Sequence, residues 1–199
     1  MAPAPPSRQD VSPWACFFLA IVIVAVAAVL LRWQGRSWFS TTGVMSAWSG
    51  DAWGRENSQQ LFDPYTFTHI THGVLIYALV WLLAGKLPLR MRLLLVITLE
   101  ASWEVYENTD AVIERYRAAT MALGYYGDSV FNSVGDTLAC VVGFFLAAKL
   151  PVRATVWTAI GLELLLTLWI RDSLLLNIVM LIHPIEAVKT WQLEIAGQG

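Results

Sequence analysis

Long blocks of apolar residues dominate this sequence of 199 residues. The first block, Trp14–Leu31, contains no charged residue, and further blocks follow at Phe67–Ala84, Leu93–Asn108, Asp128–Leu150 and Ala154–Ile170. A helix needs about 20 predominantly apolar residues to cross the hydrocarbon core of a bilayer. The pattern therefore predicts an all-α transmembrane bundle of about five spans.

The remaining segments complete one membrane domain over residues 13–199, preceded by a disordered tail over residues 1–12. The tail is rich in Pro and Ala, and such terminal segments bury little apolar surface. Residues 32–64 and 109–127 are polar and are predicted to be loops. The apolar run over residues 173–183 is too short to span, so it predicts a short helix that lies on or re-enters the membrane.

Basic residues predict the orientation of these spans. Two connections on one side of the membrane carry them: Lys86, Arg90 and Arg92 in the first, and Lys149 and Arg153 in the second. The positive-inside rule places this side in the cytoplasm, together with the amino terminus. Arg32 and Arg36, at the far end of the first span, oppose this assignment. We expect a multi-pass protein of the cell inner membrane.

Composition narrows the classes of partner. Hydrophobic residues make up 57% of the chain and charged residues 14%, with a net charge of −2. No basic surface is present to attract nucleic acid, so membrane lipids are the expected partners. Cys16 and Cys140 both lie in predicted membrane segments, and a structural disulfide is not expected.

Ionisable and amide residues inside the apolar blocks recur at helical spacing. They are His69 and His72 in the second block, Glu100, Glu104, Glu107 and Asn108 in the third, and Asp128, Asn132 and Asp136 in the fourth. With a rise of about 1.5 Å per residue, most of these groups fall near one level toward the outer ends of their helices, whereas Glu100 and Asp136 lie deeper, on the order of 12 Å in. We therefore expect His72, Glu104 and Asp128 or Asn132 to come within reach of one another. Glu163 could approach from the fifth block. Unpaired charge is costly in lipid, so the set predicts a shared polar site in the bundle interior.

The residue types in this set favour metal or acid–base chemistry. Carboxylates in a medium of low dielectric are stable as anions only beside a cation, and imidazole with carboxylate suits a divalent metal such as zinc. The candidate metal ligands are His69, His72, Glu104 and Asp128. The candidate catalytic residues, which would move a proton beside an activated water or substrate oxygen, are Glu104, His72, Glu100 and Asp136.

Substrate contacts are expected above this cluster. Arg115 and Arg117 could hold a phosphate or carboxylate headgroup through forked hydrogen bonds, and Asn108 and Asn132 could add amide contacts. Structural explanations stand beside these roles. The arginines suit a solvated loop, and buried histidines often hydrogen-bond between membrane helices. Small residues at four-residue spacing, Gly135, Ala139 and Gly143, predict close helix packing.

Four motifs carry a resemblance: YTFTHITHG over Tyr65–Gly73, LEASWEVYEN over Leu99–Asn108, IERYR over Ile113–Arg117 and GYYGDSVFNSVGD over Gly124–Asp136. Together they resemble a bacterial family of small multi-pass inner-membrane proteins described only as uncharacterised. This resemblance implies a class and a location rather than a mechanism.

The order of elements is more distantly similar to the VanZ-like group associated with glycopeptide-antibiotic tolerance. The matching positions would be His72, Tyr77, Glu100, Asp128, Asn132, Gly135 and Gly143. The chain departs from that group in His69, Glu104 and Glu107. The likeness implies a role in the cell envelope.

Two functional classes remain open on these grounds. One is an intramembrane enzyme that acts on a lipid or lipid-linked envelope substrate. It lacks recognised catalytic signatures such as HExxH or a serine elbow. The other is a non-catalytic lipid-binding, proton-coupled or transport-accessory protein that uses the same polar cavity.

Overall fold

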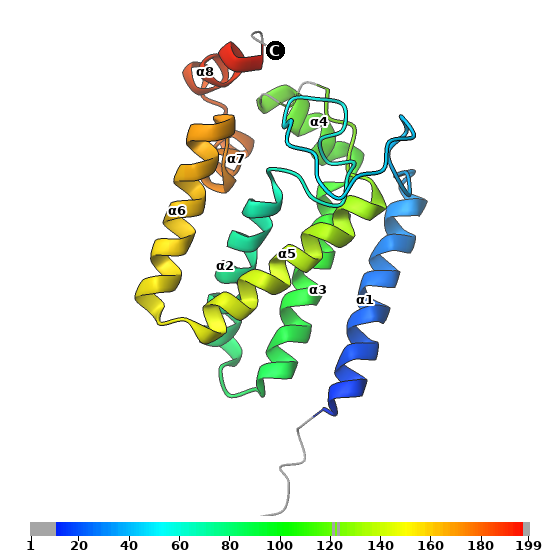
Figure 1. The fold of residues 1–199 in the computed structure, drawn as a ribbon, viewed down its shortest axis with the longest axis vertical. Helices are drawn as coiled ribbons and strands as arrows, with labels where there is room; N and C mark the ends of the chain where they lie inside the picture. The colour runs from blue at the N-terminus through cyan, green and yellow to red at the C-terminus, as the bar shows by residue number, and fades with distance from the viewer. Residues whose placement is uncertain (1–10, 121, 123, 197–199) are drawn as a thin grey trace, which may run out of the picture.

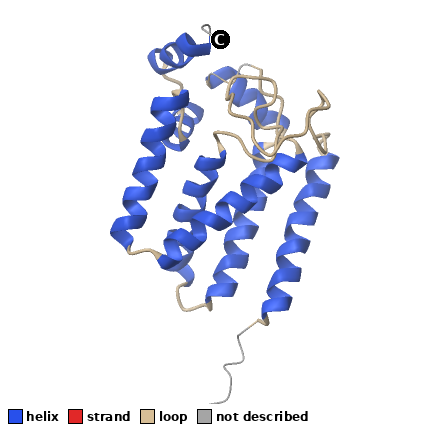
Figure 2. Ribbon diagram, in the orientation of Figure 1, coloured by secondary structure: helices blue, strands red, loops and turns tan. Residues whose placement is uncertain are grey.

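The computed structural model describes residues 11–120, 122 and 124–196, and all of its long elements are helices (Figures 1 and 2). In chain order they are α1 (Pro13–Trp33), α2 (Thr66–Ala84), α3 (Leu89–Glu107), α4 (Asp110–Ala119), α5 (Val130–Lys149), α6 (Val152–Ile170), α7 (Leu174–Ile182) and α8 (Glu186–Ala196). The predicted all-α bundle is confirmed. Most of the predicted tail, residues 1–10, lies outside the described part of the chain.

Four helices, α1, α2, α5 and α6, are long and apolar enough to cross a membrane, which makes the chain a multi-pass membrane protein. Helix α3 has 19 residues and lies beside them, in contact with α1, α2 and α5 (Figure 1). It does not reach the same apolarity because it carries two arginines and three glutamates. Packing against three neighbours buries Glu100 and Glu104, so this helix keeps its acids away from lipid.

Local capping explains where several helices begin. Ser12 accepts a hydrogen bond from the backbone N–H of Ala15, with Pro13 in the first turn of α1. Ser129 accepts in the same way from Asn132 N–H at the start of α5. Asp128 was predicted as the first residue of this span, but it precedes the cap and lies outside the helix.

Helices α2 and α5 approach each other backbone to backbone. A Cβ atom built on Gly73 would lie 2.0 Å from the carbonyl oxygen of Cys140, and one on Gly143 would lie 2.0 Å from that of Ile70. On Gly135 it would lie 1.8 Å from the carbonyl oxygen of Leu61. The predicted close packing by small residues is confirmed, and it brings the polar residues of α2 and α5 together.

The two polar segments predicted to be loops are more structured than expected. Part of residues 109–127 forms α4, which buries Ile113, Tyr116 and Ala119 on one face. The segment between α1 and α2 folds over one end of the bundle (Figure 1), and its residues Gln59 and Gln60 are almost fully buried. Short amphipathic elements of this kind give only a weak apolar signal, because tertiary packing rather than hydropathy stabilises them.

The connections are sorted between the two ends of the bundle. The α2–α3 and α5–α6 connections and the start of α1 lie at one end, whereas α4, α7, α8 and the segment between α1 and α2 lie at the other (Figure 1). The predicted grouping of the basic connections on one side is therefore confirmed.

Candidate functional site

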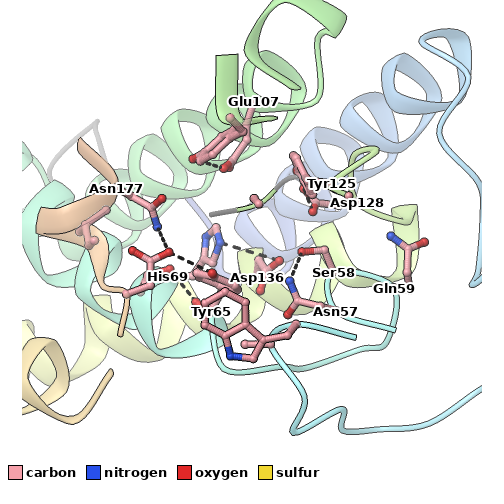
Figure 3. A pocket seen from close by; sticks show the side chains of 18 of the residues that line it. Asn57, Ser58, Gln59, Tyr65, His69, Glu107, Tyr125, Asp128, Asp136 and Asn177 are labelled. Carbon is pink, nitrogen blue, oxygen red and sulfur yellow. Dashed lines mark hydrogen bonds and ion pairs between the residues drawn. The ribbon is translucent and has the colours of Figure 1, made fainter. Parts of the chain in front are cut away.

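A cavity of about 540 Å³ lies at the end of the bundle that carries α4 and α7 (Figure 3). Its walls come from the segment between α1 and α2, from α2 to α5 and from α7 and α8. Its polar floor includes His69 and His72 from α2 and Asp136 from α5. Elements from most of the chain therefore meet around one space.

His69 is the centre of a buried network of acids. Its Nδ1 lies 2.6 Å from Glu100 Oε1 and 3.4 Å from Glu104 Oε1, and its Nε2 lies 3.8 Å from Asp136 Oδ2. His72 Nδ1 lies 3.3 Å from the same oxygen of Glu100. The predicted meeting of imidazoles and carboxylates from three helices is thus present in the structure.

Several carboxylate oxygens in this network lack a hydrogen-bond partner among the described residues. Both oxygens of Glu104 are in this position, although its side chain is only 1% exposed, and so are Glu100 Oε2 and Asp136 Oδ1. A buried unpaired carboxylate is costly unless it binds a proton or a cation. The arrangement is therefore one that a cation would stabilise.

The donor set fits a divalent metal. Two overlapping groups of three residues bring ligand atoms within 4.8 Å of one another: His69, His72 and Glu100, and His69, Glu104 and Glu107. With bonds of about 2.0–2.1 Å to a tetrahedral zinc, neighbouring ligand atoms lie about 3.3 Å apart. The His69–Glu104 and His72–Glu100 distances of 3.4 and 3.3 Å match this spacing. The shorter His69–Glu100 contact is a hydrogen bond through the same Nδ1 atom, so this nitrogen would give up that bond on ligating a metal.

The structure places one predicted metal ligand apart from the others. Asp128 belongs to neither group, because its carboxylate accepts hydrogen bonds from Asn108 Nδ2 at 2.6 Å and from the Tyr125 hydroxyl at 2.9 Å. Glu100 and Glu107 take its place among the residues with metal-ligating geometry. Asp128 lies on the cavity wall rather than in the His69 network.

Three tyrosine hydroxyls donate to carboxylates around the cavity. The pairs are Tyr65 with Asp172 at 3.0 Å, Tyr116 with Glu107 at 2.6 Å and Tyr125 with Asp128 at 2.9 Å. All six residues line the cavity. The Tyr65–Asp172 pair joins segments that are 107 positions apart, Tyr116–Glu107 joins α4 to α3, and Tyr125–Asp128 lies within one connection.

Burial raises the pKa values of acids that lie near the ends of the helices. It raises the pKa of Asp63 to about 6 and that of Asp172 to about 7, although hydrogen bonds to both carboxylates act in the opposite direction. Burial also raises the pKa of Asp128, against the hydrogen bonds from Asn108 and Tyr125. Near neutral pH Asp172 is therefore protonated in part, and a nearby cation would favour the ionised form of all three acids.

Residues 31–194 match the family described as "Protein of unknown function (DUF2585)". This chain belongs to the DUF2585 family. It is 47% identical over 186 residues to a UPF0314 protein of Paracoccus denitrificans, which covers 94% of each chain. It is 46% identical over 176 residues to a UPF0314 protein of Brucella anthropi, covering 87% of this chain and 89% of the relative.

These relatives bear out the resemblance to an uncharacterised bacterial family. No solved structure gives a significant match to the chain. The comparisons do not show the more distant similarity of this DUF2585 chain to VanZ-like proteins.

The predicted headgroup-binding arginines lie off the cavity wall in this DUF2585 protein. Arg115 Nε donates to the carbonyl oxygen of Leu181 at 2.8 Å, and Arg117 Nε donates to that of Tyr125. Both guanidinium groups are therefore hydrogen-bonded to backbone carbonyl oxygens of neighbouring segments. A headgroup in the cavity would meet Arg55 instead, which lines it from the segment between α1 and α2.

The other predicted polar residues support the walls. The side chain of Asn108 contacts Asp128 twice, because its Oδ1 also accepts from Asp128 N–H at 2.7 Å. Asn132 Nδ2 donates to the carbonyl oxygen of Gln60 at 2.9 Å, away from the cavity lining. Glu163 does not approach the cluster; it accepts from Leu175 N–H at the start of α7.

Sequence reasoning missed several residues of this site. Tyr65, Tyr116, Tyr125 and Asp172 lie in connections or in α4, outside the apolar blocks in which polar residues attract attention. All three tyrosines fall within the motifs YTFTHITHG, IERYR and GYYGDSVFNSVGD, which was the available signal. Asp172 had none, since it follows α6 in what reads as an ordinary polar turn.

Proposed function

We propose that this protein is a metal-dependent membrane enzyme that hydrolyses or transfers a group of a lipid or lipid-linked substrate. We place it in the bacterial inner membrane, with its cavity toward the outer leaflet. The observation that carries the proposal is Glu104, whose two carboxylate oxygens are buried without a partner beside His69. A structural residue would be expected to have its hydrogen bonds satisfied.

The residues around His69 would have different roles in metal binding and proton transfer. His69 and Glu104 would ligate the metal, with Glu107 completing the set or with His72 and Glu100 as alternative ligands. A bound zinc supplies a polarised oxygen or an activated water. Asp136, whose Oδ1 has no partner, lines the cavity and could accept or return a proton there.

The shape of the cavity suits an amphiphile. Its polar floor faces apolar side chains of the last two helices: Leu174, Ile178 and Leu181 of α7, and Leu193 of α8. Ile178 is 44% exposed, so this apolar wall continues to the outer surface of the protein. A headgroup could bind near His69 while its chain leaves along α7 toward the bilayer.

Elemental analysis of the protein purified in detergent without chelators tests the metal. We expect about one equivalent of zinc per chain, because the ligand types and spacing suit that ion. The variant His69→Asn should lose the metal, since His69 belongs to both candidate ligand groups. His183→Asn is the matched control, because His183 lies between α7 and α8 and does not line the cavity. Metal-free protein that still binds lipid would favour the non-catalytic alternative.

Reporter fusions test the orientation. Fusing a reporter that is active only outside the cytoplasm after Asn108 should give a signal, because the cavity end is proposed to face outward. The same reporter after Leu87, in the basic α2–α3 connection, should remain silent. Activity only after Leu87 would reverse the orientation and place the cavity toward the cytoplasm.

A further inference from the structure

The cavity that we propose as the substrate site has more acidic than basic side chains in its wall. Of the described residues that line it, four carry carboxyl groups and one carries a guanidinium group. The carboxyl groups are Glu107, Asp128, Asp136 and Asp172, and the guanidinium belongs to Arg55, which is exposed. A cation in the cavity would favour the ionised form of these acids, so a positively charged headgroup suits this wall better than one with negative charge alone.

Aromatic rings cover much of the same surface. The lining includes Trp53, Tyr65, Trp103, Tyr116, Tyr125 and Tyr126. Tyr116 and Tyr125 pack edge to face with ring centroids 5.5 Å apart, and each donates its hydroxyl to a carboxylate. Hydrogen bonding to an anion increases the electron density of a phenol ring, and the ring face attracts organic cations.

The carboxylates of the wall differ from those beside His69 in what they can bind. Asp128 and Asp172 each accept at least two side-chain hydrogen bonds, and one oxygen of Glu107 accepts from Tyr116. These carboxyl oxygens are therefore not fully free to ligate a compact metal ion, although they can still face a cation in the cavity. A large, weakly hydrated cation fits this combination of charge and aromatic surface better than a second metal does.

Two acceptors aimed at the cavity lack donors. Asp136 is 3% exposed and its Oδ1 has no partner among the described residues, and the same holds for Oδ1 of Asn57. Figure 3 shows both residues at the cavity, with Asp136 beside His69. A ligand with N–H or O–H groups would satisfy these atoms, and a primary ammonium group supplies N–H donors together with positive charge.

We propose that the cavity binds the ammonium headgroup of a lipid, between the tyrosine–carboxylate pairs and Asp136. This inference rests on the proposed function only in taking the cavity as the substrate site. It makes the substrate a zwitterionic or cationic lipid, and it excludes lipids whose headgroup carries negative charge alone.

Lipid competition on the purified full-length protein tests the inference. The protein in neutral detergent is offered equal amounts of three phospholipids with identical acyl chains and ethanolamine, choline or glycerol headgroups. Native mass spectrometry then counts the bound lipids. We expect the two ammonium lipids to be retained on the order of tenfold more than the glycerol lipid. Ethanolamine ahead of choline would further support the contacts from Asp136 and Asn57, which need N–H donors.

A paired substitution locates the effect. Tyr116→Leu should remove most of the preference, because it takes away one ring and the hydroxyl bonded to Glu107. Tyr106→Leu makes the same change on an exposed ring of α3 that does not line the cavity, and it should keep the preference. Equal retention of all three lipids by the unaltered protein overturns the inference, whether or not the variants fold.

Metal content measured on the same samples separates this inference from the proposed function. A lipid preference without bound metal contradicts the metal chemistry and supports the ammonium site. Bound metal without a lipid preference contradicts the ammonium site alone.

Discussion

Glu104→Gln is expected to abolish the cellular phenotype that distinguishes the parent from a deletion strain, while the variant still accumulates in the membrane. The exchange keeps the size of the side chain and removes one negative charge beside His69, where the two groups are 3.4 Å apart. Loss of a residue that merely supports a metal ligand costs about 10–100-fold in affinity. Loss of a ligand should cost at least as much, and zinc titration of the purified variant measures it.

A structural role for Glu104 makes a different prediction. A glutamine can donate and accept hydrogen bonds, and interhelical hydrogen bonds in membranes contribute on average only about 0.6 kcal/mol. Glu114→Gln is the control, because Glu114 is exposed on α4 and makes the same exchange outside the cavity. If Glu104→Gln binds zinc and supports the phenotype like the parent and the control, Glu104 is not a ligand.

Gly143→Ala is expected to prevent the bundle from assembling normally. The added methyl carbon would lie 2.0 Å from the carbonyl oxygen of Ile70 and 3.0 Å from the Cα atom of Gly73. Both are backbone atoms, so relief requires α2 and α5 to move apart. Overpacking of this kind typically costs about 1–3 kcal/mol and can cost more where backbone is displaced. Thermal unfolding in detergent and the amount of protein in membranes measure the effect.

Gly161→Ala is the matched control for this change. Gly161 lies in α6, and a Cβ atom there would meet nothing within 4 Å. Alanine is favoured over glycine in a helix by about 1 kcal/mol, so this variant should be as stable as the parent or slightly more stable. Equal stability of Gly143→Ala and Gly161→Ala would show that α2 and α5 are not held at the distance described.

Hydropathy alone determined the fold class, because crossing a bilayer requires long apolar helices whatever their neighbours. Helical spacing also indicated that imidazoles and carboxylates of these helices would meet, since unpaired charge has to face the interior, and it pointed to His72, Glu104 and Asp128 or Asn132. The structure confirms the fold class and the meeting of imidazoles with carboxylates. The acids that meet His69 are Glu100, Glu104 and Asp136, whereas Asp128 and Asn132 bond to other partners.

The cavity wall was decided only by tertiary structure. Tyr65 meets Asp172 across 107 positions of sequence, and Asp128 meets Asn108 across 20. Arg115 and Arg117 read as free cations in the sequence, yet both hold backbone carbonyls of neighbouring segments. Hydropathy indicates which helices lie in the lipid bilayer, and the periodicity of polar residues indicates which face of a helix points to the bundle interior. The pairing of hydrogen-bond donors with acceptors depends on how the connections fold over the end of the bundle. At that end, backbone and side chains compete for the same donors and acceptors.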